Sequence, residues 1–410
     1  KRSRKIIVMR AIRAICRFCF GMAFILSGIL KLIDPTGTGL IVSEYLNWLH
    51  LDFLNIVAQY IGIALSVTEF TIGVSILVGL RMKLFSLIGL LFISFFTIIT
   101  LFLVIFNPIE DCGCFGEAIH LSNSETLTKN IILLVMAIVI FLQRDKYRKF
   151  TSPIVDWISI FVYIVLGLYI SIHAIIYNPR VDFTDFQVGA NLKEISEGSQ
   201  RVYQSTFIYS KDGETQEFDI NNLPDSTWTY VDTKTSVVSG DSRSIAASFE
   251  VTDADGNTIT ESLFENENFF IATIYNNSRM SEKRWKRLSL LQEMLKQHNI
   301  PLYVIVGANS PSVEARSEEF NIIFSDYKTI LTMNRSNGGV LYVNEDFIIK
   351  KWASKTISAS KIEETLSQDI ALTEIKEEIK EQVSFAIIIA FIFISAIVVR
   401  FVYGLTRKKE

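Results

Sequence analysis

Cysteine is scarce in this sequence, and the charge shows no basic excess. Four cysteines in 410 residues are too few for a fold held together by several disulfides. Lys and Arg number 40 against 43 Asp and Glu, so no basic surface is indicated that would neutralise nucleic-acid phosphates. A cleaved signal peptide is not indicated either, because no small-residue cleavage site follows the basic start and first apolar run. These absences argue against a disulfide scaffold and a nucleic-acid partner.

Long apolar runs dominate the first part of the chain and recur near its end. A bilayer core requires about 20 apolar residues in a helix. We predict six spans, at residues 11–33, 54–80, 84–106, 127–142, 154–177 and 383–403. If the spans alternate, the basic stretches KRSRK, RMK, QRDKYRK and RKK all lie on one side. This Lys/Arg excess predicts a bacterial inner-membrane protein with both termini in the cytoplasm and the polar block after residue 178 in the periplasm.

Polar residues inside the predicted spans are candidates for function. One helical face of the first span carries Arg17, Gly21, Phe24, Ser27, Gly28 and Lys31. The two glycines would let another helix approach closely. Glu69 lies near the middle of the second span, where a lone carboxylate is costly, and counting from the helix ends places Arg17 at a similar depth. We therefore predict that Arg17 pairs with Glu69, either as a structural ion pair or as a proton- or ligand-handling pair.

Two other groups of residues have a structural and a functional interpretation. Cys16 and Cys19 form a C-x-x-C pattern in the first span, towards the reducing side, where helix packing is favoured over redox chemistry. His50, His120 and His173 all map to the outer membrane surface. Their spacing matches no zinc pattern, so no metal site is predicted.

Cys112 and Cys114 lie in the sequence DCGCFGE, in the loop between the third and fourth spans. A C-x-C disulfide closes a tight ring, and strained, exposed disulfides are the more easily reduced ones. The neighbouring Glu110 and Asp111 would raise the pKa values of the thiols and oppose thiolate formation. The pair is either a redox centre or a staple of the loop, and both alternatives stay open at this point.

Several separated motifs in this sequence occur in the same order as in one known family. They are RFCFGMAFILSGILKLIDPTGTG, Glu69 with GVSILVGLR, and DCGCFGEAI. Residues 10–145 resemble one four-helix unit of the DoxX/MauE group of membrane proteins, which is linked to quinone-coupled oxidation or to disulfide maturation of exported proteins. The resemblance implies that the characteristic positions are held by Arg17, Ser27, Lys31, Glu69, Cys112 and Cys114.

The polar block divides into a β-rich segment at 180–244 and an α/β segment at 245–360. The second begins with a hairpin turning at Asp255 and Gly256, followed by the strand NFFIATIY, the helix SEKRWKRLSLLQEMLKQHN, the strand IPLYVIVGA, the helix SVEARSEEFN and the strand pair GGVLYVNEDFIIKKW. This order resembles the thioredoxin-like fold of exported redox proteins. The redox residues of that fold are missing here. The position of the C-x-x-C motif is occupied by Asn277, Ser278, Arg279 and Met280, and that of the cis-proline by RSNGG.

We therefore predict a mostly α membrane protein: a DoxX-like four-helix bundle and two further spans, with a periplasmic, cysteine-free thioredoxin-like domain. The predicted units are 1–148 for the bundle, 149–179 for the fifth span and a linker, 180–244, 245–360, a periplasmic helix at 361–382, and 383–410 for the sixth span and tail. This organisation resembles an envelope protein family of the Bacteroidetes.

Two functions from different classes follow. In one, the protein is an accessory or scaffold subunit of a cell-envelope complex, with lipid and a periplasmic or envelope protein as partners and no assigned cofactor. In the other, Cys112 and Cys114 cycle and pass electrons from an exported thiol protein to a quinone near Lys31 and Glu69. A single outer thiol pair, where such relays commonly use two, favours the accessory role.

Overall fold

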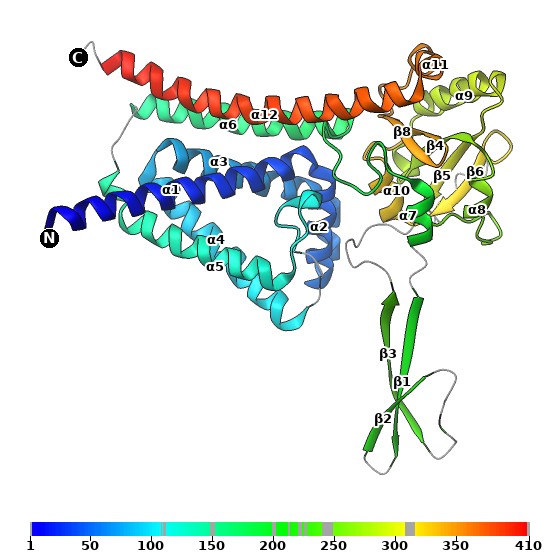
Figure 1. Cartoon of the computed structure of the whole chain (residues 1–410), viewed down its shortest axis with the longest axis horizontal. Helices are drawn as coiled ribbons and strands as arrows, with labels where there is room; N and C mark the ends of the chain where they lie inside the picture. Colours follow the sequence, from blue (N-terminus) through cyan, green and yellow to red (C-terminus); the bar gives the residue numbers. More distant parts are fainter. Residues whose placement is uncertain are drawn as a thin grey trace.

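The protein is described by a computed structural model covering residues 2–107, 109, 112–147, 152–198, 202–211, 214–219, 224, 228–239, 249–307 and 316–407. Side chains are described for these residues outside 2–6, the strands between 202 and 239, 378, 389 and 391–407. The chain forms a bundle of long helices and an α/β domain at one end of it (Figure 1).

Five helical segments are long and apolar enough to cross a membrane. They are Ile7–Ile33 in α1 (Arg2–Ile33), Asp52–Val78 in η1 (Asp52–Val57) and α3 (Ala58–Val78), α4 (Met82–Phe106), α5 (Asn123–Leu142) and α6 (Pro153–Tyr177). These segments confirm the first five predicted spans. The predicted sixth span lies in α12 (Ile370–Arg407), which runs beside α6 in Figure 1. It stays a prediction, because most of its side chains lie outside the described part of the chain.

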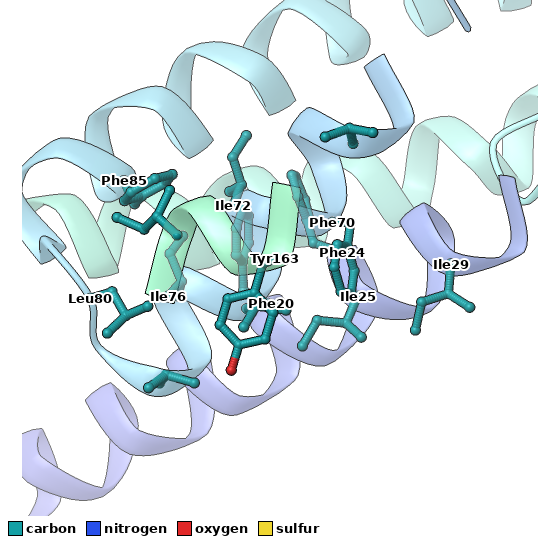
Figure 2. Packing of buried hydrophobic residues seen from close by; sticks show 14 of the residues in the cluster. Phe20, Phe24, Ile25, Ile29, Phe70, Ile72, Ile76, Leu80, Phe85 and Tyr163 are labelled. Carbon is teal, nitrogen blue, oxygen red and sulfur yellow. The ribbon is translucent and has the colours of Figure 1, made fainter. Parts of the chain in front are cut away.

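The core of the bundle is formed where α1 crosses α3. A Cβ placed on Gly28 would lie 2.7 Å from the backbone nitrogen of Phe70, so only glycine permits this approach. Gly73 on α3 faces the backbone of Ile25 in the same way. Figure 2 shows the buried aromatic and aliphatic side chains that fill the interface, with Tyr163 of α6 among them. The prediction that small residues on the first span bring a second helix close is confirmed.

A further helix lies in the first loop, where the sequence analysis expected none. Helix α2 (Pro35–Trp48) begins after Asp34, whose carboxylate accepts a hydrogen bond from the backbone N–H of Gly37 at 3.0 Å. Proline at the first helical position fits this start. Helix α2 packs on α3 and closes one side of the bundle.

The polar block contains two sheets. Strands β1 (Val202–Lys211), β2 (Glu214–Asp219) and β3 (Thr229–Ser239) form an antiparallel sheet in the order β2-β1-β3. This agrees with the β-rich character predicted for 180–244, although α7 (Leu192–Gly198) was missed.

The second sheet has five strands in the order β6-β5-β4-β7-β8. They are β4 (Asn268–Ile274), β5 (Leu302–Gly307), β6 (Asn321–Ser325), β7 (Gly339–Asn344) and β8 (Phe347–Trp352). β4, β5 and β6 run parallel, whereas β7 is antiparallel to both β4 and β8. Helices α9 (Glu282–Gln297) and α11 (Ala359–Ser367) cover one face, and α7, α8 (Thr260–Leu263) and α10 (Tyr327–Met333) cover the other. Because both faces are covered, the inner strands β4, β5 and β7 are mostly apolar, whereas the edge strands β6 and β8 carry polar residues.

Several details of the α/β segment differ from expectation. The predicted hairpin is reduced to one bridge, between Thr252 and Thr258, around a turn at Gly256. The helix predicted over SVEARSEEFN lies partly outside the described residues, and its described part, 316–320, is a turn. Strand β6 and helix α10 were not predicted. The charged helix expected at 361–382 is divided, because the carboxylate of Asp369 caps the start of α12 by accepting a hydrogen bond from the N–H of Leu372.

Candidate functional site

Cys112 and Cys114 lie in the loop that follows α4, and both are free thiols. Their sulfur atoms are 3.0 Å apart, because the chain turns through Gly113, whose φ of 64° is a conformation that favours glycine. The hydroxyl of Tyr45 on α2 donates to the Cys112 sulfur at 3.4 Å, and Ser27 of α1 donates to the carbonyl oxygen of Cys114 at 2.6 Å. The structure therefore holds the two sulfurs in contact, anchored to two different helices.

The two thiols have unlike acidities. A hydrogen bond from Cys112 lowers the pKa of the Cys114 thiol to about 6, against the effect of burial and with help from the positive charges of Lys129 and Lys31. The same hydrogen bond and burial raise the pKa of Cys112. Cys114 is thus the more acidic thiol of the pair, and such unequal acidity is typical of reactive dithiols.

The expectation that neighbouring carboxylates raise both thiol pKa values stays a prediction. Glu110 and Asp111, on which that expectation rested, lie outside the described residues. Lys129, on α5, lies with its ammonium 4.5 Å from the ring centroid of Phe115 and supplies positive charge that the sequence analysis did not connect with the cysteines.

Glu69 pairs with Lys31, and the prediction of an Arg17–Glu69 pair is wrong. The Nζ of Lys31 lies 2.7 Å from Oε2 of Glu69, and the two side chains are 15 % and 10 % exposed. Arg17 instead donates to the carbonyl oxygens of Ile76 and Leu77 at the end of α3, each at 2.8 Å. Those residues are seven and eight positions beyond Glu69, a rise of roughly 10 Å along the helix. Arg17 therefore caps the end of α3, whose free carbonyls favour a cation.

A cavity of about 680 Å³ lies between the ion pair and the cysteine loop. Its polar end is lined by Ser27, Lys31, Glu69, Cys112 and Cys114. Most of the remaining wall is apolar and comes from α1, α2, α4 and α5, with Phe92, Phe95, Phe96, Phe102 and Phe106 on one side. A volume of this size, with mostly apolar walls and a few convergent polar groups, is typical of a site for a small organic ligand. The structure thus brings together five predicted intramembrane and loop positions at one cavity and leaves Arg17 outside it.

The α/β domain contacts the cysteine loop through a buried arginine. Arg335 precedes β7 and is 3 % exposed at its side chain. Its guanidinium lies 2.6 Å from the Asp34 carboxylate, at the start of α2, and 3.5 Å from that of Glu117 in the turn η2 (Gly116–Ala118). These contacts place the α/β domain and the cysteine loop at the same end of the bundle.

The loop that carries Arg335 is itself tied to the loop after β4. The side chain of Asn337 donates to the carbonyl oxygen of Asn276 at 2.7 Å and accepts from its N–H at 3.0 Å. The turn η4 (Asn277–Arg279) follows directly and includes three of the four residues that stand at the expected C-x-x-C position. This segment is therefore near the membrane domain but carries no thiol.

Other candidates do not join the cavity. Cys16 is half-buried in the bundle core and Cys19 is exposed on α1. His50, His120 and His173 lie after α2, after η2 and near the end of α6, respectively. Among the described residues, no group of three His, Cys, Asp or Glu side chains has a geometry that could hold a metal ion.

Four side chains at the site were missed by sequence reasoning: Asp34, Tyr45, Lys129 and Arg335. Asp34 had a readable signal, since Asp followed by Pro is typical of a helix start. Tyr45, Lys129 and Arg335 had none, because their roles depend on which helices and domains pack together.

Comparison with protein families supports the membrane domain. Residues 9–143 match the family of the methylamine utilisation protein MauE, and residues 203–240, which include most of β1–β3, match a domain of unknown function, DUF8463. Comparisons with curated proteins and with solved structures gave no match. The membrane domain of this chain is thus similar to the MauE family over residues 9–143. The chain is a multi-pass membrane protein with an additional α/β domain.

Proposed function

We propose that this protein is a membrane thiol oxidoreductase that transfers electrons from an exported thiol protein to a quinone. The observation that carries the proposal is the cavity, because it joins the Cys112–Cys114 pair to an apolar chamber within the helices. A loop disulfide with a purely structural role requires no such chamber and no thiolate. The acidity of Cys114 supports the same conclusion.

The residues present fit a quinone by size and chemistry. The cavity falls within the range of about 300–1,000 Å³ common for small-ligand sites. A bound quinone would accept two electrons and two protons from the dithiol and become a quinol. Lys129 places positive charge at the polar end of the cavity, where it favours negative charge that develops as electrons enter, whereas Lys31 is paired there with Glu69.

The chain's own residues would act as follows. Cys114, the more acidic thiol, would react first, and the pair would give two electrons and two protons to the bound quinone as one S–S bond forms between Cys112 and Cys114. Tyr45 holds the Cys112 sulfur in place. A dithiol of the exported partner reduces the new disulfide through a mixed disulfide, and the partner leaves with a disulfide of its own. Thiols are thus oxidised in the partner and the quinone is reduced, with the cysteine pair restored.

The topology in this proposal puts the cysteine loop and the α/β domain in the periplasm and both termini in the cytoplasm, with α12 as a sixth span. The Lys/Arg distribution supports this orientation. The α/β domain is proposed to be a thioredoxin-like domain without dithiol chemistry that presents the exported partner. Its strand order, with β4 central and α9 following it, supports this assignment.

Thiol trapping in cells tests the proposal. Cells are quenched in acid and alkylated after the quinone pool has been reduced or oxidised, and the redox state of Cys112 and Cys114 is read by mass. The pair should be mainly dithiol when the pool is reduced and mainly disulfide when it is oxidised. A pair that stays fully oxidised in both conditions would be a structural staple.

The second candidate is an accessory or scaffold subunit of an envelope complex. The buried contact of Arg335 with Asp34 favours it, because it fixes a cysteine-free domain on the bundle in a defined position. Purification under native conditions distinguishes this role. A stoichiometric protein partner that persists when both cysteines are replaced by serine supports the scaffold, and a protein that purifies alone contradicts it.

A further inference from the structure

A second binding region lies on the other side of the molecule, between α6, α12 and the α/β domain. A polar chamber of about 630 Å³ lies next to an apolar chamber of about 140 Å³, and His173 and Arg180 line both. Neither chamber shares a lining residue with the cavity at the cysteines. The region thus consists of two adjacent chambers, one polar and one apolar.

The polarity changes at the level where the membrane surface is expected. Tyr169, His173 and Tyr177 lie one turn apart on α6, with ring centroids 6.1 Å and 5.0 Å apart between successive members. Tyr169 lines the apolar chamber and Tyr177 the polar one. Aromatic rings with a polar group gather at the boundary between hydrocarbon and headgroups. A ligand that fills both chambers therefore crosses this boundary.

The apolar chamber opens towards lipid. Ile170, Ala174 and Ile387 contribute to its wall, and its lining has almost no polar surface. Tyr169 and Ile387 are each 59 % exposed. An acyl chain can therefore enter it from the bilayer, whereas a ligand dissolved in water would have to leave water for an apolar wall.

The polar chamber has an excess of positive charge. Besides Arg335, which pairs with Asp34 outside the chamber, its cationic side chains are Arg180, Lys350, Lys351, Lys361 and Lys380, and its acidic ones are Asp182, Glu364, Glu377 and Glu381. Lys351 pairs with Asp182 at 2.6 Å, and Lys350 and Lys380 both pair with Glu377. Within the described part of the chain, Arg180 and Lys361 form no ion pair.

Glu381 does not compensate for these two cations. Its burial and the neighbouring carboxylate of Asp182 raise its pKa to about 7, so it is partly neutral at physiological pH. An anionic group bound beside Arg180 and Lys361 would complete the charge balance of the chamber.

We propose that the two chambers hold one anionic phospholipid from the leaflet on the α/β-domain side. Its headgroup binds at Arg180 and Lys361, and the upper part of one acyl chain lies between α6 and α12. The lipid thereby joins α12 and the α/β domain to the bundle. A free phosphate compound shares the headgroup chemistry but does not fill the apolar chamber.

Native mass spectrometry tests this assignment on the full chain. The protein is exchanged into vesicles of equimolar phosphatidylglycerol and phosphatidylcholine, extracted in mild detergent, and scored for retained lipid. One phosphatidylglycerol should be retained in preference to phosphatidylcholine. Arg180→Gln and Lys361→Gln should each reduce that preference by roughly 5-fold, as expected for one charge at a lipid surface. Arg279→Gln with Lys283→Gln, two exposed cations of the α/β domain outside both chambers, is the matched control and should change nothing.

Two further arms separate the possible outcomes. Ala174→Phe fills the apolar chamber and should reduce phosphatidylglycerol retention while Arg180 and Lys361 are unchanged. Glycerol phosphate, which has the anion without the chains, should not displace the lipid at equal concentration. Equal retention of both lipids, unchanged retention in the two charge variants, or displacement by glycerol phosphate would overturn the proposal.

Discussion

The guanidinium of Arg335 in the α/β domain lies 2.6 Å from the carboxylate of Asp34 in the membrane domain, 301 residues away in the sequence. Both side chains are at most 5 % exposed. Asp34 also caps α2, the helix that carries Tyr45 and lines the cavity. This ion pair therefore links the position of the α/β domain to the geometry around the cysteines.

Arg335→Gln should loosen this link. It leaves the Asp34 carboxylate buried without its cation, which costs about 3–5 kcal/mol. Hydrogen exchange should become faster in α2 and in the loop before β7, and adding Asp34→Asn should recover part of the loss. Arg316→Gln is the control, because its partner Glu282 is 87 % exposed and such pairs are worth about 1 kcal/mol or less. Equal effects of the two arginine substitutions would contradict the coupling.

The reactivity of Cys114 should titrate near neutral pH. In the reduced protein with Cys16 and Cys19 replaced by serine, alkylation by N-ethylmaleimide should be slow below pH 6, where Cys114 is protonated, and reach its plateau above it. Cys112→Ala removes the largest stabilising contact of the thiolate, so the midpoint should shift upward. Lys129→Met should shift it in the same direction. A midpoint near the ordinary thiol value in the parent protein would contradict the assigned roles.

Filling the cavity should block electron transfer without changing the thiols. Ala23 lines the cavity from α1, so Ala23→Trp should reduce quinone reduction strongly while the Cys114 titration stays as in the parent. Ala14→Trp, at an exposed position on the same helix, is the matched control. If both variants reduce quinone at the parental rate, the cavity is not the acceptor site.

The Lys31–Glu69 pair should contribute both to the stability of the bundle and to the rate of quinone reduction. Glu69→Gln leaves the Lys31 ammonium without its carboxylate and should destabilise the bundle by about 3–5 kcal/mol. Lys31→Met with Glu69→Leu replaces both charges by apolar groups and should restore the thermal stability. Loss of the Lys31 ammonium as a donor at the cavity should still slow quinone reduction, by about 100-fold if it stabilises developing charge. If the double variant is stable and reduces quinone at the parental rate, the pair has a structural role only.

Hydropathy and charge predicted much of this architecture because both act locally along the chain. Five spans and the main strands of the α/β domain follow from apolar runs and their lengths. The partner of Glu69 was mispredicted because counting from the helix ends misjudged the depth of Arg17, which meets α3 at Ile76 and Leu77, roughly 10 Å beyond Glu69. Lys31 lies on the same face of α1 as Arg17, and the packing of Gly28 against Phe70 decides which of the two reaches the carboxylate.

The cavity and the contact of Arg335 could not be predicted from the sequence. A cavity results from side chains of five helices that do not fill the space between them, and no single segment encodes it. Arg335 lies in RSNGG, where it resembles any loop arginine until the domain is docked on the bundle. By contrast, α2 had a local signal in Asp34 and Pro35, and it was missed because the first loop was taken as a simple connection.

The most direct test of thiol oxidation coupled to quinone reduction uses the purified, fully reduced protein under anaerobic conditions. One equivalent of a short-chain quinone is added, its absorbance is followed, and remaining thiols are counted by alkylation and mass. We predict that one quinone is reduced for each Cys112–Cys114 disulfide formed, and that Cys112→Ser and Cys114→Ser each abolish the reaction. Quinone that stays oxidised beside an intact dithiol, or that is reduced equally well by the serine variants, would contradict the proposed function.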